Sequence, residues 1–154
     1  MSYTQIIRKQ IIKKDINDVW VFMSSPKNLE KITPKWMQFK ITSSNVDKTM
    51  YPGMIISYKV APFLSIPIKW VTEITHVKEK EFFVDEQRIG PYKIWHHQHR
   101  FEQKEEGILI TDTITYIPPF GLLGRISNYL FIKKRINLIF DYRHNILEKL
   151  FCKK

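Results

Sequence analysis

Three of the five histidines in this chain stand together, at His96, His97 and His99. Successive side chains of a β-strand point to opposite faces, so His97 and His99 share one face of any strand that contains them. The same face carries two large aromatic side chains, Trp95 and Phe101. Imidazoles can bind a metal ion, transfer a proton or orient a ligand. This segment is therefore the first candidate for a functional site.

The elements that position this segment are predicted from hydrophobic periodicity and turn residues. A strand over residues 3–13 precedes two short helices, with Asp15 and Ser25 as N-caps. We then expect six strands near residues 37–41, 54–60, 66–74, 82–88, 92–104 and 108–116, and one long helix over 125–151. Helices gathered on one side of an antiparallel sheet make an α+β domain, and we expect one domain over residues 1–154.

The long helix follows a proline-rich loop over residues 118–124 and has one apolar face at helical spacing. That face consists of Tyr129, Ile132, Ile136, Ile139, Phe140, Arg143, Leu147 and Leu150. Arg143 is its one charged residue. Two interpretations stay open: the Arg143 side chain reaches solvent, or it pairs with an inner carboxylate such as Asp85.

Strand register can be predicted, because a slip of one residue would send every side chain to the other face. A last hairpin centred on Glu105–Glu106 places His99 opposite Asp112, where cross-strand neighbours interact. The same arithmetic predicts six further pairs: Trp95 with Tyr116, Phe101 with Ile110, Asp85 with Trp95, Phe83 with His97, Ile74 with Asp85, and Thr72 with Gln87.

The predicted inner face of the sheet is aromatic, yet it also contains Asp, Gln and His. It consists of Tyr58, Trp70, Thr72, Phe83, Asp85, Gln87, Trp95, His97, His99, Phe101, Asp112 and Tyr116. Such a mixture is more typical of a ligand pocket than of a dry core. These twelve residues are the predicted ligand-binding set.

Three loops are expected at one end of the sheet, and two of them are apolar and proline-rich. Their candidate gate residues are Pro62, Phe63, Leu64, Gly90, Pro91, Phe120 and Leu122. Apolar loops beside a cavity mouth can admit a hydrophobic ligand or contact a membrane. They can equally cap the core, and the sequence leaves both interpretations open.

Composition limits the kinds of partner and the cellular compartment that we expect for this protein. The net charge of +10 favours an anionic partner, such as an anionic membrane surface, but no nucleic-acid-binding motif accompanies it. The apolar runs are too short to span a bilayer, and the N-terminus lacks a secretory signal. Cys152 is the sole cysteine, so we expect a protein of the reducing cytoplasm.

Five segments carry a resemblance to a known group: Trp70–Ile74, Phe83–Tyr92, Trp95–Phe101, Asp112–Tyr116 and Pro119–Gly121. With the order of elements, they resemble the helix-grip fold of the START/SRPBCC superfamily, in its polyketide cyclase/dehydrase-like "ligand-binding" bacterial branch. The resemblance implies a curved seven-stranded antiparallel sheet around a long C-terminal helix, with two short helices after the first strand. It also implies a deep cavity between sheet and helix.

The leading functional hypothesis is binding of a hydrophobic or aromatic small molecule, such as a lipid, a quinone or a polyketide-like compound, without a cofactor. The alternative is a cyclase or dehydratase that uses His99 and Asp112 as a general-base pair. A metal site at His97 and His99, completed by Asp85 or Asp112, is weakly supported by the spacing alone, and we expect none. A purely structural cluster is the fourth interpretation.

Overall fold

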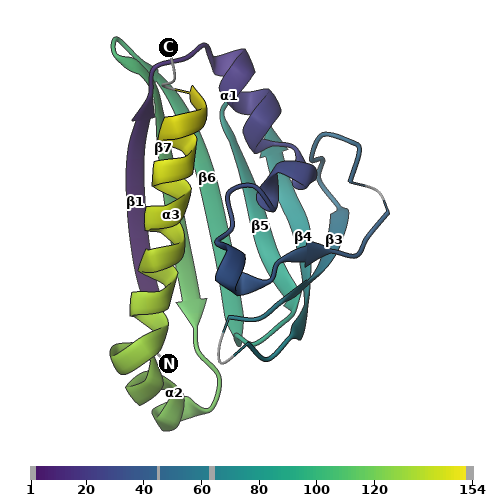
Figure 1. Cartoon of the computed structure of the whole chain (residues 1–154), viewed down its shortest axis with the longest axis vertical. Coiled ribbons are helices and arrows are strands. Elements are labelled where there is room, and N and C mark those ends of the chain that lie inside the picture. The colour runs from purple at the N-terminus through teal and green to yellow at the C-terminus, as the bar shows by residue number, and fades with distance from the viewer. Residues whose placement is uncertain (1–2, 45, 63–64, 152–154) are drawn as a thin grey trace.

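One antiparallel sheet of seven strands forms the body of the protein (Figure 1). The computed structural model describes residues 3–44, 46–62 and 65–151. The strands are β1 (Thr4–Ile12), β2 (Lys40–Ile41), β3 (Met54–Val60), β4 (Ile68–Lys78), β5 (Phe82–Ile89), β6 (Ile94–Lys104) and β7 (Gly107–Ile117). They lie in the order β1-β7-β6-β5-β4-β3-β2. The predicted α+β class and the number of strands are confirmed.

The helices cover one face of this sheet. They are α1 (Ile16–Met23), two 3₁₀ turns η1 (Pro26–Leu29) and η2 (Lys35–Met37), and then α2 (Gly121–Ser127), the π-helical turn η3 (Asn128–Ile132) and α3 (Lys133–Phe151). In Figure 1, α3 runs along the β1–β7 side, and α1 with the 3₁₀ turns lies over β4–β6. Within the described part of the chain, no helix is long and apolar enough to cross a membrane.

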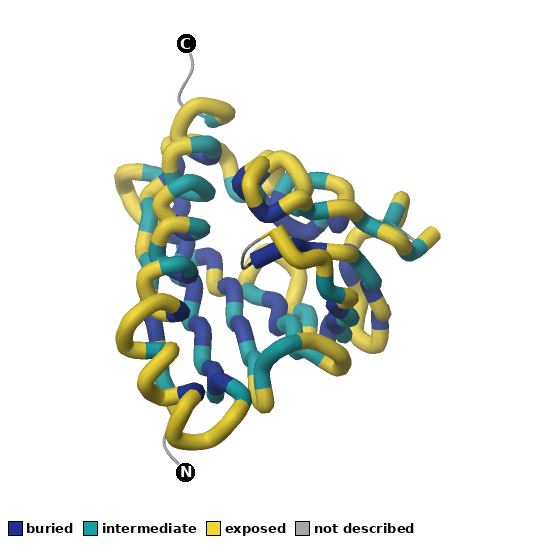
Figure 2. Tube along the Cα trace, turned by 60° about the horizontal axis from the view of Figure 1, so that its bottom comes forward, coloured by how far each residue is buried: buried dark blue, intermediate teal, exposed yellow. Residues whose placement is uncertain are grey.

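The space between sheet and helices is partly filled by a hydrophobic core. Trp20 of α1 packs edge-to-face against Phe83 and Phe101 of the sheet. Two register shifts in the β4–β5 pairing, one of them between Val71 and Thr72, introduce bulges that bend a sheet. Along β7, buried residues alternate with residues of intermediate exposure, as expected of a strand with one face on the core (Figure 2).

Most of the predicted register is confirmed. His99 pairs with Asp112, Trp95 with Tyr116 and Phe101 with Ile110, and the two predicted β4–β5 pairs are also present. The β5–β6 register is wrong by two residues. Asp85 lies opposite His97 rather than Trp95, and Phe83 opposite His99 rather than His97.

The side chain of Gln87 explains this shift. It donates to the backbone oxygen of Tyr92 at 2.7 Å and accepts from the Tyr92 nitrogen at 3.2 Å, which extends the connection beyond the expected turn at residues 89–91. Gly90 leaves room for this side chain, because a Cβ there would lie 2.4 Å from Gln87 Oε1. A shift of two residues preserves the face, so Asp85 and His97 still point inward together.

The expected strand over residues 37–41 is largely wrong. Its first part is the 3₁₀ turn η2, and only Lys40–Ile41 pairs with β3. Gln38, with φ 46°, adopts the left-handed conformation at the end of η2, which breaks an extended run. The second predicted helix is confirmed as the 3₁₀ turn η1, although Ser25 makes no side-chain cap.

The long helix begins at Gly121, four residues before the predicted start. Two members of its predicted apolar face, Tyr129 and Leu150, are exposed. The π-helical turn changes the phase of the helix, and Asn128 takes the inward position. Its amide accepts from Tyr116 Oη at 2.7 Å and donates to Thr4 Oγ1 at 3.1 Å. The register of the helix against the sheet is therefore fixed by a polar contact.

A substitution at Gly124 tests how closely α2 packs against the loop that precedes it. A Cβ at this position would lie 1.7 Å from the backbone oxygen of Pro119, so the backbone must move to accept Gly124→Ala. We expect this variant to lower the free energy of unfolding by about 1–3 kcal/mol. Ser127→Ala, at an exposed position of the same helix, should leave it unchanged in urea denaturation. Equal stability of the two variants would contradict the close packing of Gly124 against Pro119.

Candidate functional site

Two carboxylates and two imidazoles meet on the inner face of β5, β6 and β7. His97 Nε2 lies 3.0 Å from Asp112 Oδ1, and His97 Nδ1 lies 3.3 Å from Asp85 Oδ2. His99 repeats the arrangement, with Nε2 3.0 Å from Asp85 Oδ2 and Nδ1 2.7 Å from Asp112 Oδ1. The four side chains therefore form a closed ring, which we call the Asp–His quartet.

The quartet is nearly inaccessible to water. The side chains of His97 and His99 are 5% and 4% exposed, and their rings lie with centroids 3.8 Å apart at an interplanar angle of 42°. Phe83 stacks on His99 from one side, and Phe140 of α3 packs edge-on against His97. The short contact from His99 Nδ1 to Asp112 lacks hydrogen-bond geometry, so this nitrogen has no hydrogen-bond partner among the described residues.

In the quartet, the neighbouring charges and hydrogen bonds together shift the pKa values of His97, Asp85 and Asp112 more than burial does. Burial alone lowers the pKa of His97, but the charges of Asp85 and Asp112 and the hydrogen bonds to them raise it above its ordinary value. Burial alone raises the pKa of Asp85, yet His97 and His99 hold it below the usual range. The same balance lowers the pKa of Asp112. A His97 ring with both nitrogens against carboxylates is satisfied only when both carry a proton.

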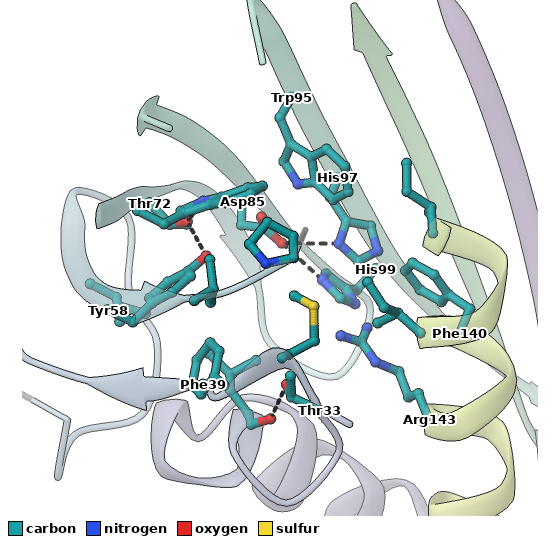
Figure 3. Close-up of a pocket in the computed structure, with 18 of the residues that line it drawn as sticks. Thr33, Phe39, Tyr58, Thr72, Asp85, Trp95, His97, His99, Phe140 and Arg143 are labelled. Carbon is teal, nitrogen blue, oxygen red and sulfur yellow. Dashed lines mark hydrogen bonds and ion pairs between the residues drawn. The ribbon is translucent and has the colours of Figure 1, made fainter. Parts of the chain in front are cut away.

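A cavity of about 130 Å³ lies beside the quartet, between the sheet, α3 and the segment that follows α1 (Figure 3). Its lining is mainly aliphatic and aromatic: Leu29, Thr33, Met37, Phe39, Met50, Ile56, Tyr58, Val60, Pro62, Trp70, Thr72, Ile74, Phe83, Asp85, Tyr92, Trp95, His97, His99, Ile136, Ile139, Phe140 and Arg143. The quartet thus forms one polar corner of an otherwise apolar chamber.

The opposite wall is aromatic and its polar atoms are paired. Trp70 stacks on Tyr58 and packs edge-on against Trp95. The Trp70 indole nitrogen donates to Thr72 Oγ1 at 3.1 Å, and this hydroxyl also bonds to Tyr58 Oη at 2.8 Å. Burial and the charge of Asp85 raise the pKa of Tyr58, so its phenol stays neutral. The polar atoms of this wall are therefore hydrogen-bonded without a ligand.

The structure brings eight of the twelve predicted ligand-binding residues to the cavity: Tyr58, Trp70, Thr72, Phe83, Asp85, Trp95, His97 and His99. Four do not line it. Phe101 packs in the core against Trp20, Gln87 binds the backbone of Tyr92, and Tyr116 binds Asn128. Asp112 does not line the cavity, but it contacts three residues that do, namely His97, His99 and Arg143.

Of the predicted gate residues, Pro62 lines the cavity, whereas Phe120 and Leu122 are exposed and do not. Gly90 and Pro91 lie in the β5–β6 connection and do not line it either, but the next residue, Tyr92, does. Phe63 and Leu64, like Cys152, lie outside the described residues.

Sequence reasoning missed most of the wall that faces the sheet. Those lining residues come from η1, η2, the segments around them and α3, among them Leu29, Thr33, Phe39 and Ile139. The signal for the α3 residues was present, because Ile136, Ile139, Phe140 and Arg143 share the predicted apolar face. Arg143 does not pair with Asp85. Its Nη1 lies 3.9 Å from Asp112 Oδ1 instead.

The quartet has donor atoms suited to a metal ion. One ligand atom each from Asp85, His97 and His99 lies within 4.8 Å of the others. In the arrangement described, however, these atoms already neutralise one another, and the guanidinium of Arg143 adds a positive charge nearby. Metal binding would have to displace the proton that the raised pKa of His97 retains.

The quartet predicts a stability maximum in mildly acidic solution. Because the pKa of His97 is raised in the folded state, its contribution is complete below about pH 6.5 and is lost as the pH rises through the raised value. Because the pKa values of Asp85 and Asp112 are lowered, their contribution is present above about pH 4 and is lost as the pH falls. A tenfold difference in proton affinity between the folded and unfolded states corresponds to about 1.4 kcal/mol of stability.

Urea denaturation at several pH values measures this profile. His97→Gln should lower the free energy of unfolding by about 3–5 kcal/mol at pH 6, because it leaves buried carboxylates unpaired. It should also remove the loss of stability that the unaltered protein shows as the pH rises above about 6.5. The control is His96→Gln, whose histidine is more exposed and pairs with Glu86. An unchanged pH profile in His97→Gln would contradict the assignment.

Comparisons with known proteins support the fold. No family model and no curated protein sequence matches the chain. Among solved structures, protein CV1439 of Chromobacterium violaceum is similar with a TM-score of 0.74 at 12% identity, over 97% of this chain and 99% of that one. The di-domain ARO/CYC StfQ of the steffimycin biosynthetic pathway reaches 0.72 at 7% identity, over 97% of this chain and 50% of that one.

A plant protein, the major latex-like protein 151 of Panax ginseng, is similar with a TM-score of 0.57 at 17% identity, over 88% of this chain and 96% of that one. At such low identities these likenesses establish the fold alone. They confirm the helix-grip architecture that the sequence resemblance implies, and this chain has that fold.

Proposed function

We propose that this protein binds a small, largely aromatic molecule in the cavity between its sheet and α3. The observation that carries the proposal is the combination of an aromatic chamber with one converging polar corner, a typical composition of ligand sites. The aromatic wall around Trp70 keeps its polar atoms paired, so an apolar ring can pack on it without leaving buried groups unsatisfied.

The size of the cavity narrows the ligand class. At about 130 Å³ it is smaller than the roughly 300–1,000 Å³ of sites for drug-sized ligands. A cavity of about 150 Å³ engineered into another protein accepts benzene. A compound with one aromatic ring therefore fits as the site stands, whereas a long-chain lipid or a multi-ring polyketide would require it to widen.

The arrangement of the quartet favours binding over general-base catalysis. A base must present an unprotonated nitrogen to the substrate. Both ring nitrogens of His97, and both of His99, lie within 3.3 Å of a carboxylate oxygen instead. The predicted catalytic pair, His99 with Asp112, is in contact, but Asp112 does not line the cavity.

Filling the cavity tests the proposal. Ile139→Trp places a large ring in the chamber, and we expect it to weaken the binding of single-ring aromatic compounds at least about tenfold. We also expect it to lower the free energy of unfolding by about 1–3 kcal/mol, because the added ring overpacks the site. Leu138→Trp on the exposed side of the same helix is the matched control. Calorimetry with benzoate, benzamide, indole, a short-chain benzoquinone and a fatty acid measures affinity.

Two outcomes would contradict the proposal: no binding of any aromatic compound by the unaltered protein, or unchanged binding by Ile139→Trp. Mass spectrometry of the same mixtures separates binding from catalysis. We expect each compound to be recovered unchanged, and conversion that His99→Ala abolishes would instead support the enzyme hypothesis.

A second proposal concerns the surface of α2 and η3. This segment exposes seven large apolar residues: Phe120, Leu122, Leu123, Ile126, Tyr129, Leu130 and Phe131. It is the exposed lower end of the helix in Figure 2. Between Asp112 and Asp141 the chain has no acidic residue, but it has Arg125 and the triplet Lys133–Arg135. We propose that this apolar and basic surface contacts an anionic membrane.

A second copy of the chain is a less suitable occupant, because two molecules with a net charge of +10 repel each other. An anionic bilayer offers both an apolar interior for the exposed side chains and a negative surface for the basic ones. Each Lys or Arg near such a surface contributes about 1 kcal/mol.

Vesicle flotation tests the membrane contact. We expect binding to vesicles of phosphatidylserine and phosphatidylcholine that weakens in high salt, and little binding to phosphatidylcholine alone. The double variant Leu122→Ser with Tyr129→Ser should lose at least about tenfold in binding. The control pair Ile7→Ser and Ile11→Ser, exposed on β1, should not. Absent or salt-independent binding, or a concentration-dependent dimer in sedimentation, would refute the contact.

A further inference from the structure

Arg143 is a mostly buried cationic side chain, two of whose nitrogen atoms donate no hydrogen bond to any described residue. It extends from α3 into the cavity, beside His99 (Figure 3). Its side chain is 11% exposed, so little of it reaches water. The guanidinium packs over the ring of Phe140, with its carbon 4.8 Å from the centroid. This packing holds the group in place, but it supplies no hydrogen-bond acceptor.

Two nitrogen atoms of Arg143 lack a hydrogen-bond acceptor in the part of the chain that the structure describes. Nε and Nη1 are buried, and neither has a hydrogen-bond partner among the described residues. The carboxylate in ion-pair contact with this side chain belongs to Asp112, whose Oδ1 is 3.9 Å from Nη1, too far for a hydrogen bond. That oxygen already contacts His97 and His99. Asp112 therefore balances part of the charge but does not satisfy the donors.

Buried donors without partners are unfavourable, and more so when the group is charged. Buried polar groups are usually hydrogen-bonded, and exceptions mark places where a partner is absent. His99 Nδ1 also lacks a hydrogen-bond partner among the described residues, but it lies 2.7 Å from a carboxylate oxygen of Asp112, whereas no acceptor lies that close to the Arg143 nitrogens. Tyr58, Thr72 and Trp70 bind one another, and Asp85 is engaged by both imidazoles.

We infer that the ligand of this cavity is a small aromatic carboxylate, whose carboxylate accepts hydrogen bonds from Arg143 while its ring packs in the apolar chamber. The inference rests on the proposed ligand-binding function and names the chemical class of the ligand. The planar fork of a guanidinium matches the two oxygens of a carboxylate. The negative charge of Asp85, which also faces the chamber, is paired with His97, whose pKa is raised, so it does not exclude an anion.

Paired probes of the same shape test this inference. Benzoate and benzamide differ mainly in charge, so their affinities for the unaltered protein isolate the contribution of the anion. We expect benzoate to bind about ten- to a hundredfold more tightly, in line with a hydrogen bond to a charged group. Arg143→Met should remove this preference, because it weakens the binding of the anionic benzoate more than that of the neutral benzamide. Arg135→Met removes the same charge from the same helix outside the cavity, and should preserve the preference.

A second variant guards against loss of folding. Arg143→Lys keeps the charge without the planar fork, and should weaken benzoate binding about tenfold with the fold intact. Thermal unfolding without ligand separates a ligand-binding role from a structural one. We expect Arg143→Met to be at least as stable as the unaltered protein, because it removes unsatisfied buried donors.

The possible failures are distinguishable. Equal binding of benzoate and benzamide, with no effect of Arg143→Met on the ratio, overturns the carboxylate inference and leaves ligand binding in place. Failure of every aromatic probe to bind the unaltered protein overturns both. A less stable Arg143→Met that still prefers benzoate identifies Arg143 as a structural counter-charge of Asp112, and also overturns the inference.

Discussion

The Asp–His quartet is the interaction on which the arrangement of this protein depends. Four ionisable side chains from three neighbouring strands are buried together, and each is tolerable only because the others are there. Removing one member would leave a charge unpaired in the protein interior, which solvates it poorly. The quartet therefore requires the registers of β5–β6 and β6–β7 at the same time. It gives one end of the apolar core a fixed polar corner.

The same interaction determines what the site can do. Carboxylates on both sides of the His97 ring favour its protonated form, and in both imidazoles they lie against the nitrogens that a general base would use. What remains for a ligand is the unsatisfied guanidinium of Arg143 and a chamber lined by aromatic rings. Such a site is suited to holding a small anion with an apolar body. Acid–base chemistry by the histidines would first require the quartet to open.

Much of the sheet could be predicted from the sequence, because alternation along β6 and β7 permits one register that buries both apolar faces. His99 and Asp112 were paired on that basis alone. The partner of Asp85 was not, because the β5–β6 register is set by side-chain bonds from Gln87 to the backbone of Tyr92. No hydrophobic pattern encodes such a contact.

The helical wall of the cavity was harder to predict for a related reason. Its residues come from segments far from the sheet residues in sequence, and their placement depends on how α3 and the 3₁₀ turns pack on the sheet. The π-helical turn changes the phase of the last helix and turns Tyr129, which is 87% exposed, out of the face where periodicity placed it. Arg143 was recognised as exceptional, but its unmet hydrogen bonds became apparent only from the packing.

The protonation state of His97 tests the account most directly. Nitrogen-15 NMR of the histidine rings reports each ring nitrogen separately, and the signals can be assigned by comparison with His97→Gln. The account predicts that both nitrogens of His97 carry a proton at pH 7, because each faces a carboxylate in the buried quartet. A neutral His97, with one unprotonated nitrogen at that pH, would contradict the account and restore the general-base interpretation.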